Sequence, residues 1–216
     1  MYAKFWKRFF DFTLSLLALI VLSPVLLVLI IVGAIAMRGN PFFVQARPGK
    51  IDKNTGKEKI FKLIKFRTMS NKRDKDGNLL PDAERLNGYG KFLRKTSLDE
   101  LGELVNIVKG DMAIVGPRPL LVAYLPRYSA RQRRRHEVRP GLTGYAQAYG
   151  RNLLTWEEKF EKDVYYVDNL SFWLDVKIIF KTISVVLKRE GITSDTSVTM
   201  EEFMGVEKEM KVINHE

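Results

Sequence analysis

The sequence contains no cysteine and only two histidines, His136 and His215, among its 216 residues. Disulfides, zinc–thiolate sites and a cysteine nucleophile are therefore excluded. A histidine-rich metal site or a Ser-His-Asp triad is not expected from so few histidines. Carboxylates and cations remain as the main candidates for any chemistry.

Acidic residues are scarce relative to basic ones. The chain has 36 Lys and Arg against 25 Asp and Glu, which gives a formal charge of +11. This excess indicates an anionic partner, such as nucleic acid, a phosphorylated substrate or an anionic membrane surface. The length suits one domain with its own core and an appendage.

Charge is absent from residues 12–37, FTLSLLALIVLSPVLLVLIIVGAIAM. As one straight helix this run would measure about 39 Å, against about 30 Å for a hydrocarbon core. It is too long for a signal peptide, and no small-x-small cleavage pattern follows it. A single transmembrane helix is the simplest interpretation.

Two features of the same run favour a re-entrant helical hairpin instead. Ser23-Pro24 lies near its middle, where proline breaks a helix and leaves two arms of about 18 Å, each too short to cross. Cations also flank both ends, and the positive-inside rule then places both ends in the cytoplasm; they are Lys4, Lys7, Arg8, Arg38, Arg47 and Lys50. The Ser23 hydroxyl is expected to bind a carbonyl that Pro24 frees.

The segment after the run predicts a β-hairpin followed by a helix. Residues 42–47 and 59–69 are rich in aromatic and β-branched residues, and turn formers separate them. Pro81 stands at a first-turn position and predicts a helix over residues 82–95. Its last turn carries Arg94 and Lys95, where the helix dipole favours cations.

The pair Asp99-Glu100 in TSLDE allows two interpretations. Ser97 with Glu100 three residues later is the capping-box pattern, and an apolar-periodic run follows it as far as Gly110. The pair is then an ordinary helix start. Alternatively, two adjacent carboxylates beside cations form a reactive centre.

Further arginines follow the pair. The sequence Gly116-Pro117-Arg118-Pro119 predicts a stiff loop that presets one guanidinium, a group suited to bidentate phosphate recognition. Residues 131–139, RQRRRHEVR, predict a solvated helix face or a contact with an anionic surface.

The last third of the chain is predicted to be helical. Thr155 and Glu158 form a second capping box that opens a helix to about residue 169. Residues 171–189 form a basic amphipathic helix, for which the membrane surface and the core are equally compatible. The expected organisation is a re-entrant membrane helix over 1–38, a catalytic domain over 39–195 and a loosely ordered tail over 196–216.

These parts together suit phosphoryl transfer at a membrane surface. A carboxylate can act as a nucleophile or hold Mg²⁺, and arginines neutralise a transferring phosphoryl group. The main non-enzyme alternative is a membrane-anchored basic module that binds anionic lipid or nucleic acid. That alternative accounts for the charge and the apolar run, but not for the adjacent carboxylates.

Four ordered motifs closely resemble the monotopic phosphoglycosyl transferases, a family of bacterial sugar transferases. They are KFRTM, LRKTSLDELGELVNIVKGDMAIVGPRPL, VRPGLTGYAQAYGRN and FEKDVYYVDNLSFWLDVKI. The similarity covers about residues 1–203, and the short length resembles minimal members such as the Campylobacter PglC type. The resemblance implies an α+β fold, mostly helical with a small β-hairpin, a re-entrant membrane helix hairpin and interfacial amphipathic helices.

The resemblance also implies an activity and a location. Such enzymes move a sugar phosphate from a UDP-sugar to a polyprenol phosphate such as undecaprenyl phosphate, releasing UMP with Mg²⁺ as cofactor. This is the first membrane step of glycoconjugate biosynthesis. The implied location is the cytoplasmic face of the bacterial inner membrane, with lipid and no nucleic acid as partner. The sugar, the pathway and the oligomeric state stay open.

The family's catalytic residues can be carried over by motif. Its Asp-Glu dyad falls on Asp99 and Glu100, with Asp99 implied as the nucleophile of a covalent phospho-sugar intermediate and as a Mg²⁺ ligand. The role of Glu100 stays open among proton transfer, orientation of Asp99 and metal contact. The phosphate-binding residues fall on Arg94, Arg118, Arg151 and Lys65, and the helix break falls on Ser23 and Pro24.

Four positions depart from the family pattern. Gly102-Glu103 stand where Pro-Gln is usual, Tyr145 where Trp is usual and Tyr149 where Asn is usual. None of these changes removes a group implied in catalysis. The two tyrosines bear on nucleotide or sugar specificity.

Overall fold

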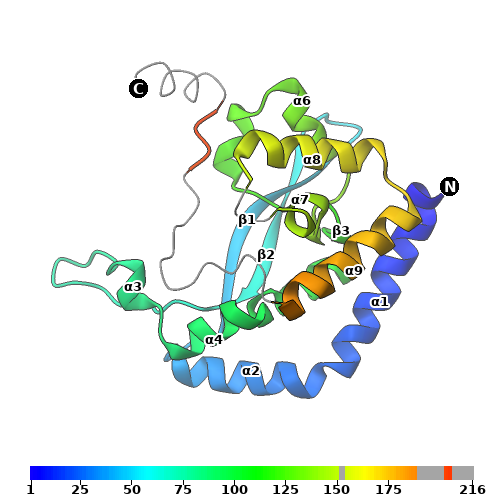
Figure 1. Cartoon of the computed structure of the whole chain (residues 1–216). Coiled ribbons are helices and arrows are strands. Elements are labelled where there is room, and N and C mark those ends of the chain that lie inside the picture. The colour runs from blue at the N-terminus through cyan, green and yellow to red at the C-terminus, as the bar shows by residue number, and fades with distance from the viewer. Residues whose placement is uncertain (151–153, 189–201, 206–216) are drawn as a thin grey trace.

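The computed structural model describes residues 1–150, 154–188 and 202–205. It is an α+β fold in which helices surround a long two-stranded hairpin (Figure 1). The predicted class, mostly helical with a small hairpin, is confirmed in this respect. The helices are α1 (Lys7–Val21), α2 (Ser23–Ala36), α3 (Asp82–Arg85), α4 (Gly88–Thr96), α5 (Glu103–Lys109), α6 (Ala130–Arg133), α7 (Tyr145–Ala148), α8 (Trp156–Asp168) and α9 (Phe172–Lys188). The strands are β1 (Phe42–Ile51), β2 (Glu58–Phe66), β3 (Ala113–Val115) and β4 (Gly141–Thr143).

The apolar run forms two helices, α1 and α2, which meet at a sharp bend. The pair Tyr2–Val21 and Ser23–Ala36 is bent by 65°. Because Pro24 has no N–H, the carbonyl of Ile20 four residues earlier loses its helical partner. The Ser23 hydroxyl donates to that carbonyl at 2.7 Å, as predicted. Within the described residues, no helix is by itself long and apolar enough to cross a membrane, although this bent pair meets both criteria together.

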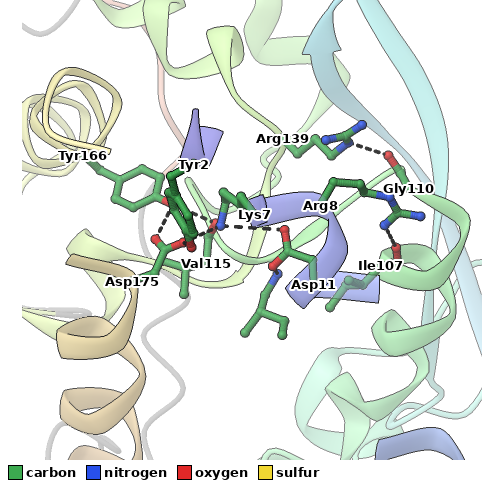
Figure 2. Close-up of polar contacts among 11 residues, drawn as sticks. Tyr2, Lys7, Arg8, Asp11, Ile107, Gly110, Val115, Arg139, Tyr166 and Asp175 are labelled. Atoms are coloured by element: carbon green, nitrogen blue, oxygen red, sulfur yellow. Dashed lines mark hydrogen bonds and ion pairs between the residues drawn. The ribbon is translucent and has the colours of Figure 1, made fainter. Parts of the chain in front are cut away.

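A buried polar network fixes α1 to the rest of the fold (Figure 2). Lys7 Nζ lies 2.7 Å from Asp175 on α9, and the Tyr2 hydroxyl donates to the same carboxylate at 2.6 Å. Tyr166 on α8 donates to Asp175 at 2.7 Å and also lies 3.0 Å from the Val115 carbonyl oxygen at the end of β3. The ion pair needs these hydrogen bonds because charges are costly to bury. The network therefore holds helix α1 against β3, the strand that leads to Arg118.

The hairpin β1–β2 is antiparallel, with Phe42 opposite Phe66, which confirms the predicted hairpin. A buried side chain, Asn106 on α5, continues this sheet at its edge: it accepts the Ile64 N–H at 3.0 Å and donates to the Lys62 carbonyl at 2.7 Å. These bonds satisfy backbone groups that an open edge would leave unpaired. The hairpin is therefore held beside the segment that carries Asp99 and Glu100.

The predicted helix over residues 82–95 is wrong as one unit. Residues 82–85 and 88–96 are separate helices, because Leu86 is extended and forms an antiparallel bridge with Met69. Asn87 is the N-cap of the second helix, α4, and its side chain accepts the Gly90 N–H at 2.9 Å. The Asn-Gly pair at residues 87–88 was the local signal for this break.

The predicted capping box at Ser97 is also wrong. Ser97 has φ 56° and ends α4 in the left-handed region, and its side chain caps nothing. The 3-10 segment η2 (Leu98–Gly102) follows, and only then does α5 begin. The predicted end at Gly110 is confirmed, with φ 89°. The Glu100 carboxylate therefore takes no part in a capping box and is available for other contacts.

The C-terminal helices form as predicted. The capping box at the start of α8 is confirmed: Thr155 accepts the Glu158 N–H at 3.2 Å, and Glu158 accepts the Thr155 N–H at 2.8 Å. Helix α9 buries Asp175 and Ile178 and leaves Trp173 71% exposed, so it has both a core face and an exposed apolar face.

A short piece of the C-terminal tail, residues 202–205, packs against the domain. Phe203 is fully buried between Tyr124 and Phe160. This packing lies inside the range predicted to be a loosely ordered tail, whose other residues fall outside the described part of the chain. The apolar content of these four residues accounts for the contact.

Candidate active site

Glu100 is the centre of a cluster of charges contributed by three separate segments. Its carboxylate lies 2.9 Å from Lys65 Nζ on β2 and 3.0 Å from an Arg118 guanidinium nitrogen. Burial alone would raise the pKa of Glu100, but the two cations outweigh it and hold the pKa at about 2. Three of the predicted site residues are thus together, and Glu100 is ionised at any working pH.

Arg118 is positioned by its loop. A Cβ on Gly116 would lie 2.3 Å from the Arg139 carbonyl oxygen, so glycine permits the close approach of the loop to that segment. The carbonyl of Arg118 accepts a hydrogen bond at 2.7 Å from Arg135, which is itself buried and paired with Asp163 at 2.7 Å. The Arg118 side chain remains 47% exposed and available to a ligand.

Glu103 is a second carboxylate in the cluster that sequence reasoning did not assign to the site. Its side chain is only 4% exposed and lies 2.9 Å from Lys65 Nζ, so this lysine is shared between Glu100 and Glu103. Burial raises the pKa of Glu103 to about 7, with the Glu100 charge adding to the effect against the pull of Lys65. The i, i+3 spacing of the two glutamates was the available signal.

Asp99 lies beside the cluster without taking part in its ion pairs. Among the described residues, no Lys, Arg or His nitrogen comes within 4 Å of its carboxylate. Burial and the neighbouring Glu100 raise its pKa, whereas Lys65 and Arg118 act in the opposite direction. Asp99 is therefore the carboxylate of the dyad that the described residues leave without an ion pair.

This arrangement fits Mg²⁺ in one specific way. The described residues contain no group of three or more His, Asp or Glu side chains arranged to hold a metal by themselves. Mg²⁺ at phosphoryl-transfer sites is instead held by one or two carboxylates together with substrate phosphates. Asp99, whose carboxylate forms no ion pair with any described residue, suits the role of a single protein ligand that acts together with substrate phosphates.

The remaining predicted phosphate ligands lie outside the cluster. The exposed Arg94 donates to Thr68 Oγ1 at 3.1 Å and to Met69 Sδ at 2.9 Å rather than to either carboxylate of the dyad. Arg151 lies outside the described residues.

Arg47 on β1 is a cation that sequence reasoning counted only as a membrane flank. Burial lowers its pKa, and so does the positive charge of Arg118, whereas Glu103 raises it. Arg47 therefore lies within electrostatic reach of the cluster.

The arginine-rich run at residues 131–135 is largely neutralised by carboxylates within the fold. Arg135 is buried, so the predicted solvated or anion-binding face is wrong for this residue. The other arginines of the run pair with carboxylates from distant segments: Arg131 with Glu161, Arg133 with Glu58 and Arg134 with Asp168. Much of the positive charge of the run is therefore paired within the fold.

The raised pKa of Glu103 predicts a pH-dependent stability. Between about pH 5 and pH 7 the folded protein keeps a proton that the unfolded chain has released, so this contribution falls as pH rises through about 7. Glu103→Gln cannot titrate. We therefore expect its melting temperature to fall less than that of the unsubstituted protein between about pH 5 and pH 7.5.

Buried His136, whose pKa is lowered to about 3, acts in the opposite direction below about pH 6.5 and is common to both proteins. The difference between them therefore isolates Glu103. Glu137→Gln, at an exposed surface pair, serves as the matched control. An unchanged pH slope in the Glu103 variant would contradict the assignment.

Comparison with known proteins places the chain in a family. A family model described as bacterial sugar transferase matches residues 2–189. The uncharacterized sugar transferase EpsL of Bacillus subtilis is 50% identical over 199 residues, covering 92% of this chain and 96% of EpsL.

Two relatives carry names that state an activity. The undecaprenyl-phosphate galactose phosphotransferase of Salmonella typhimurium is 36% identical over 88% of this chain. The UDP-glucose:undecaprenyl-phosphate glucose-1-phosphate transferase of Klebsiella pneumoniae is 38% identical over 82% of it. The chain spans 42% and 39% of these longer relatives. Because the family match covers almost all of the described residues, the chain belongs to the bacterial sugar transferase family.

Proposed function

We propose that the protein is a phosphoglycosyl transferase that moves a sugar-1-phosphate from a UDP-sugar to a polyprenol phosphate, with release of UMP. The observation that carries the proposal is the Asp99 carboxylate, which forms no ion pair within residues 1–150, 154–188 and 202–205. It lies beside Glu100, which Lys65 and Arg118 hold ionised. Undecaprenyl phosphate, named for the relatives from Salmonella and Klebsiella, is the acceptor class that this proposal adopts.

The chemistry proceeds as two in-line displacements. An Asp99 carboxylate oxygen attacks the sugar-bearing phosphorus, and the bond to the bridging oxygen breaks, so that UMP leaves with the electron pair. The acceptor phosphate oxygen then attacks the aspartyl phosphorus, and the carboxylate leaves unchanged. Arg118 and Lys65 offset the charge that develops on the phosphoryl oxygens. Mg²⁺, when bound at Asp99, adds further neutralisation of the diphosphate.

The membrane part of the proposal rests on the bent helix pair. The 65° bend at Ser23-Pro24 and the cations on both flanks support a hairpin that enters and leaves through the cytoplasmic face. The exposed Trp173 and Phe180 on α9 add an apolar face suited to the interface. The acceptor phosphate then meets the active site while its tail stays in lipid.

Single cysteines test this topology cleanly, because the sequence has none. We expect Lys4→Cys and Lys53→Cys, at exposed positions before and after the apolar run, to be labelled from the same side of sealed inverted vesicles by an impermeant maleimide. Both positions should be protected in vesicles of the opposite orientation. Labelling from opposite sides would show a spanning helix and end the hairpin proposal.

An assay of UMP release tests the activity itself. We expect the protein to release UMP over many turnovers from one or more members of a UDP-sugar panel. This multiple-turnover release should require both polyprenol phosphate and Mg²⁺. A binding module would bind anionic vesicles or nucleic acid without releasing UMP. That alternative is also weakened by the internal pairing of the arginines at 131–135. Absence of UMP across a broad panel would contradict the proposed function.

A further inference from the structure

Arg47 presents a guanidinium whose hydrogen-bonding capacity is only partly used. One terminal nitrogen donates to Gln45 at 2.6 Å, whereas the buried Nε has no partner in the part of the chain that the structure describes. Among the described residues, no carboxylate oxygen lies within ion-pairing distance of Arg47. A buried donor without a partner is unfavourable, and the buried polar groups of folded proteins are almost always satisfied. Arg47 therefore keeps hydrogen-bonding capacity that the described residues do not use.

The neighbourhood of Arg47 indicates the charge of a ligand suited to this capacity. Burial lowers the pKa of Arg47 most, and the charge of the nearby Arg118 lowers it further, against a smaller opposing effect of Glu103. One guanidinium nitrogen of Arg118 donates a hydrogen bond to Glu100, and about half of the Arg118 side chain is exposed. Two guanidinium groups repel each other unless an anion lies between them. A phosphate oxygen pair suits this arrangement because the planar guanidinium binds it bidentately.

The position of Arg47 on the hairpin distinguishes the two substrates. Phe42, at the start of β1, belongs to the cluster that packs with Leu29 of α2, so this end of the hairpin lies at the apolar arm. Arg47 is five residues further along β1, or about 17 Å away in an extended strand. Lys65 pairs with Phe43, near the α2 end. Arg47 instead lies toward η3 (Val122–Arg127) and Tyr128, whose ionisable groups act on it.

We propose that Arg47 and Arg118 together bind the nucleotide-side phosphate of the donor, the phosphate that departs with the nucleoside. This inference rests on the proposed function, because it assigns one half of the donor diphosphate. A lipid acceptor reaches the cluster from the α2 end, whereas a water-soluble nucleotide diphosphate has access from the end where Arg47 lies. Arg47 is then a donor-binding residue, and Asp99 and Lys65 act on the transferred phosphate.

Steady-state kinetics with two variants test the assignment. Arg47→Lys keeps the charge but loses the planar fork, and Arg47→Gln loses both. We expect the KM for the UDP-sugar to rise about 10-fold for Arg47→Lys and about 100-fold for Arg47→Gln, on the scale of lost charge-assisted hydrogen bonds. The KM for polyprenol phosphate should change less than about threefold. Lys62→Gln, which removes a cation from an exposed position on the same hairpin, should leave both values unchanged.

A measurement on the unsubstituted protein covers the case in which a variant fails to fold. UDP alone should protect Arg47 and Arg118 from modification by phenylglyoxal, as read by peptide mass spectrometry, whereas polyprenol phosphate alone should leave Arg47 reactive. Unchanged donor KM in folded variants, a rise in acceptor KM instead, or no protection of Arg47 by UDP would each overturn the inference. If the unsubstituted protein releases no UMP, the proposed function fails, and protection by UDP still decides whether Arg47 binds a nucleotide phosphate.

Discussion

Asp99→Asn is expected to abolish UMP release, lowering turnover by about 10⁴-fold or more, the scale on which loss of a nucleophile acts. The amide is nearly the same size as the carboxylate but cannot act as the nucleophile that forms the acyl-phosphate bond. Because Asp99 forms no ion pair within the described residues, the melting temperature should stay within about 2 °C of the unsubstituted value.

Two comparisons make this result specific. Asp168→Asn removes a carboxylate from an exposed ion pair with Arg134 and should retain full activity. Glu100→Gln should retain more activity than Asp99→Asn, because Glu100 is already engaged by Lys65 and Arg118. Near-normal turnover of folded Asp99→Asn would remove Asp99 from the nucleophile role.

Arg118→Gln is expected to lower kcat/KM by about 10² to 10³-fold, the usual scale for one electrostatic donor at a developing charge. The substitution removes the proposed phosphate ligand and also one of the two cations that lower the pKa of Glu100. The acidic limb of its pH–rate profile should therefore move to higher pH. The reason is that Glu100 becomes protonated at a higher pH in the variant than in the unsubstituted protein.

The matched control for Arg118 is Arg133→Gln. Arg133 forms a similar short pair, with Glu58 at 2.6 Å, but it lies on α6 and touches none of the cluster residues. It should retain full kcat/KM. If Arg118→Gln kept kcat/KM within about threefold, the guanidinium would have no part in stabilising the charge that develops on the donor diphosphate during transfer.

Local patterns in the sequence predicted the features that depend on near neighbours. The hydroxyl of Ser23 and the missing N–H of Pro24 act within one turn, and the capping box of Thr155 and Glu158 spans three residues. Alternating apolar residues around turn formers likewise specify the β1–β2 hairpin. Such features form wherever the local chain can satisfy its own backbone.

Features that depend on distant partners could not be predicted in this way. Ser97 and Glu100 match a capping box, but Glu100 instead pairs with Lys65, which is 35 residues away in the chain. Arg135 belongs to a run that predicts a solvated face, yet Asp163 compensates its burial. Glu103 and Arg47 enter the site only because the hairpin folds beside η2. In each case the deciding contact joins segments that no local window contains.

The central claim is that Asp99 carries the sugar phosphate between donor and acceptor. The most direct measurement is peptide mass spectrometry of the protein incubated with its UDP-sugar and Mg²⁺ in the absence of polyprenol phosphate. The account predicts one equivalent of UMP per protein and a sugar-phosphate mass added to the peptide that contains Asp99, which disappears when acceptor is added. An enzyme that turns over with acceptor but carries no such adduct, or carries it on another residue, would contradict the account.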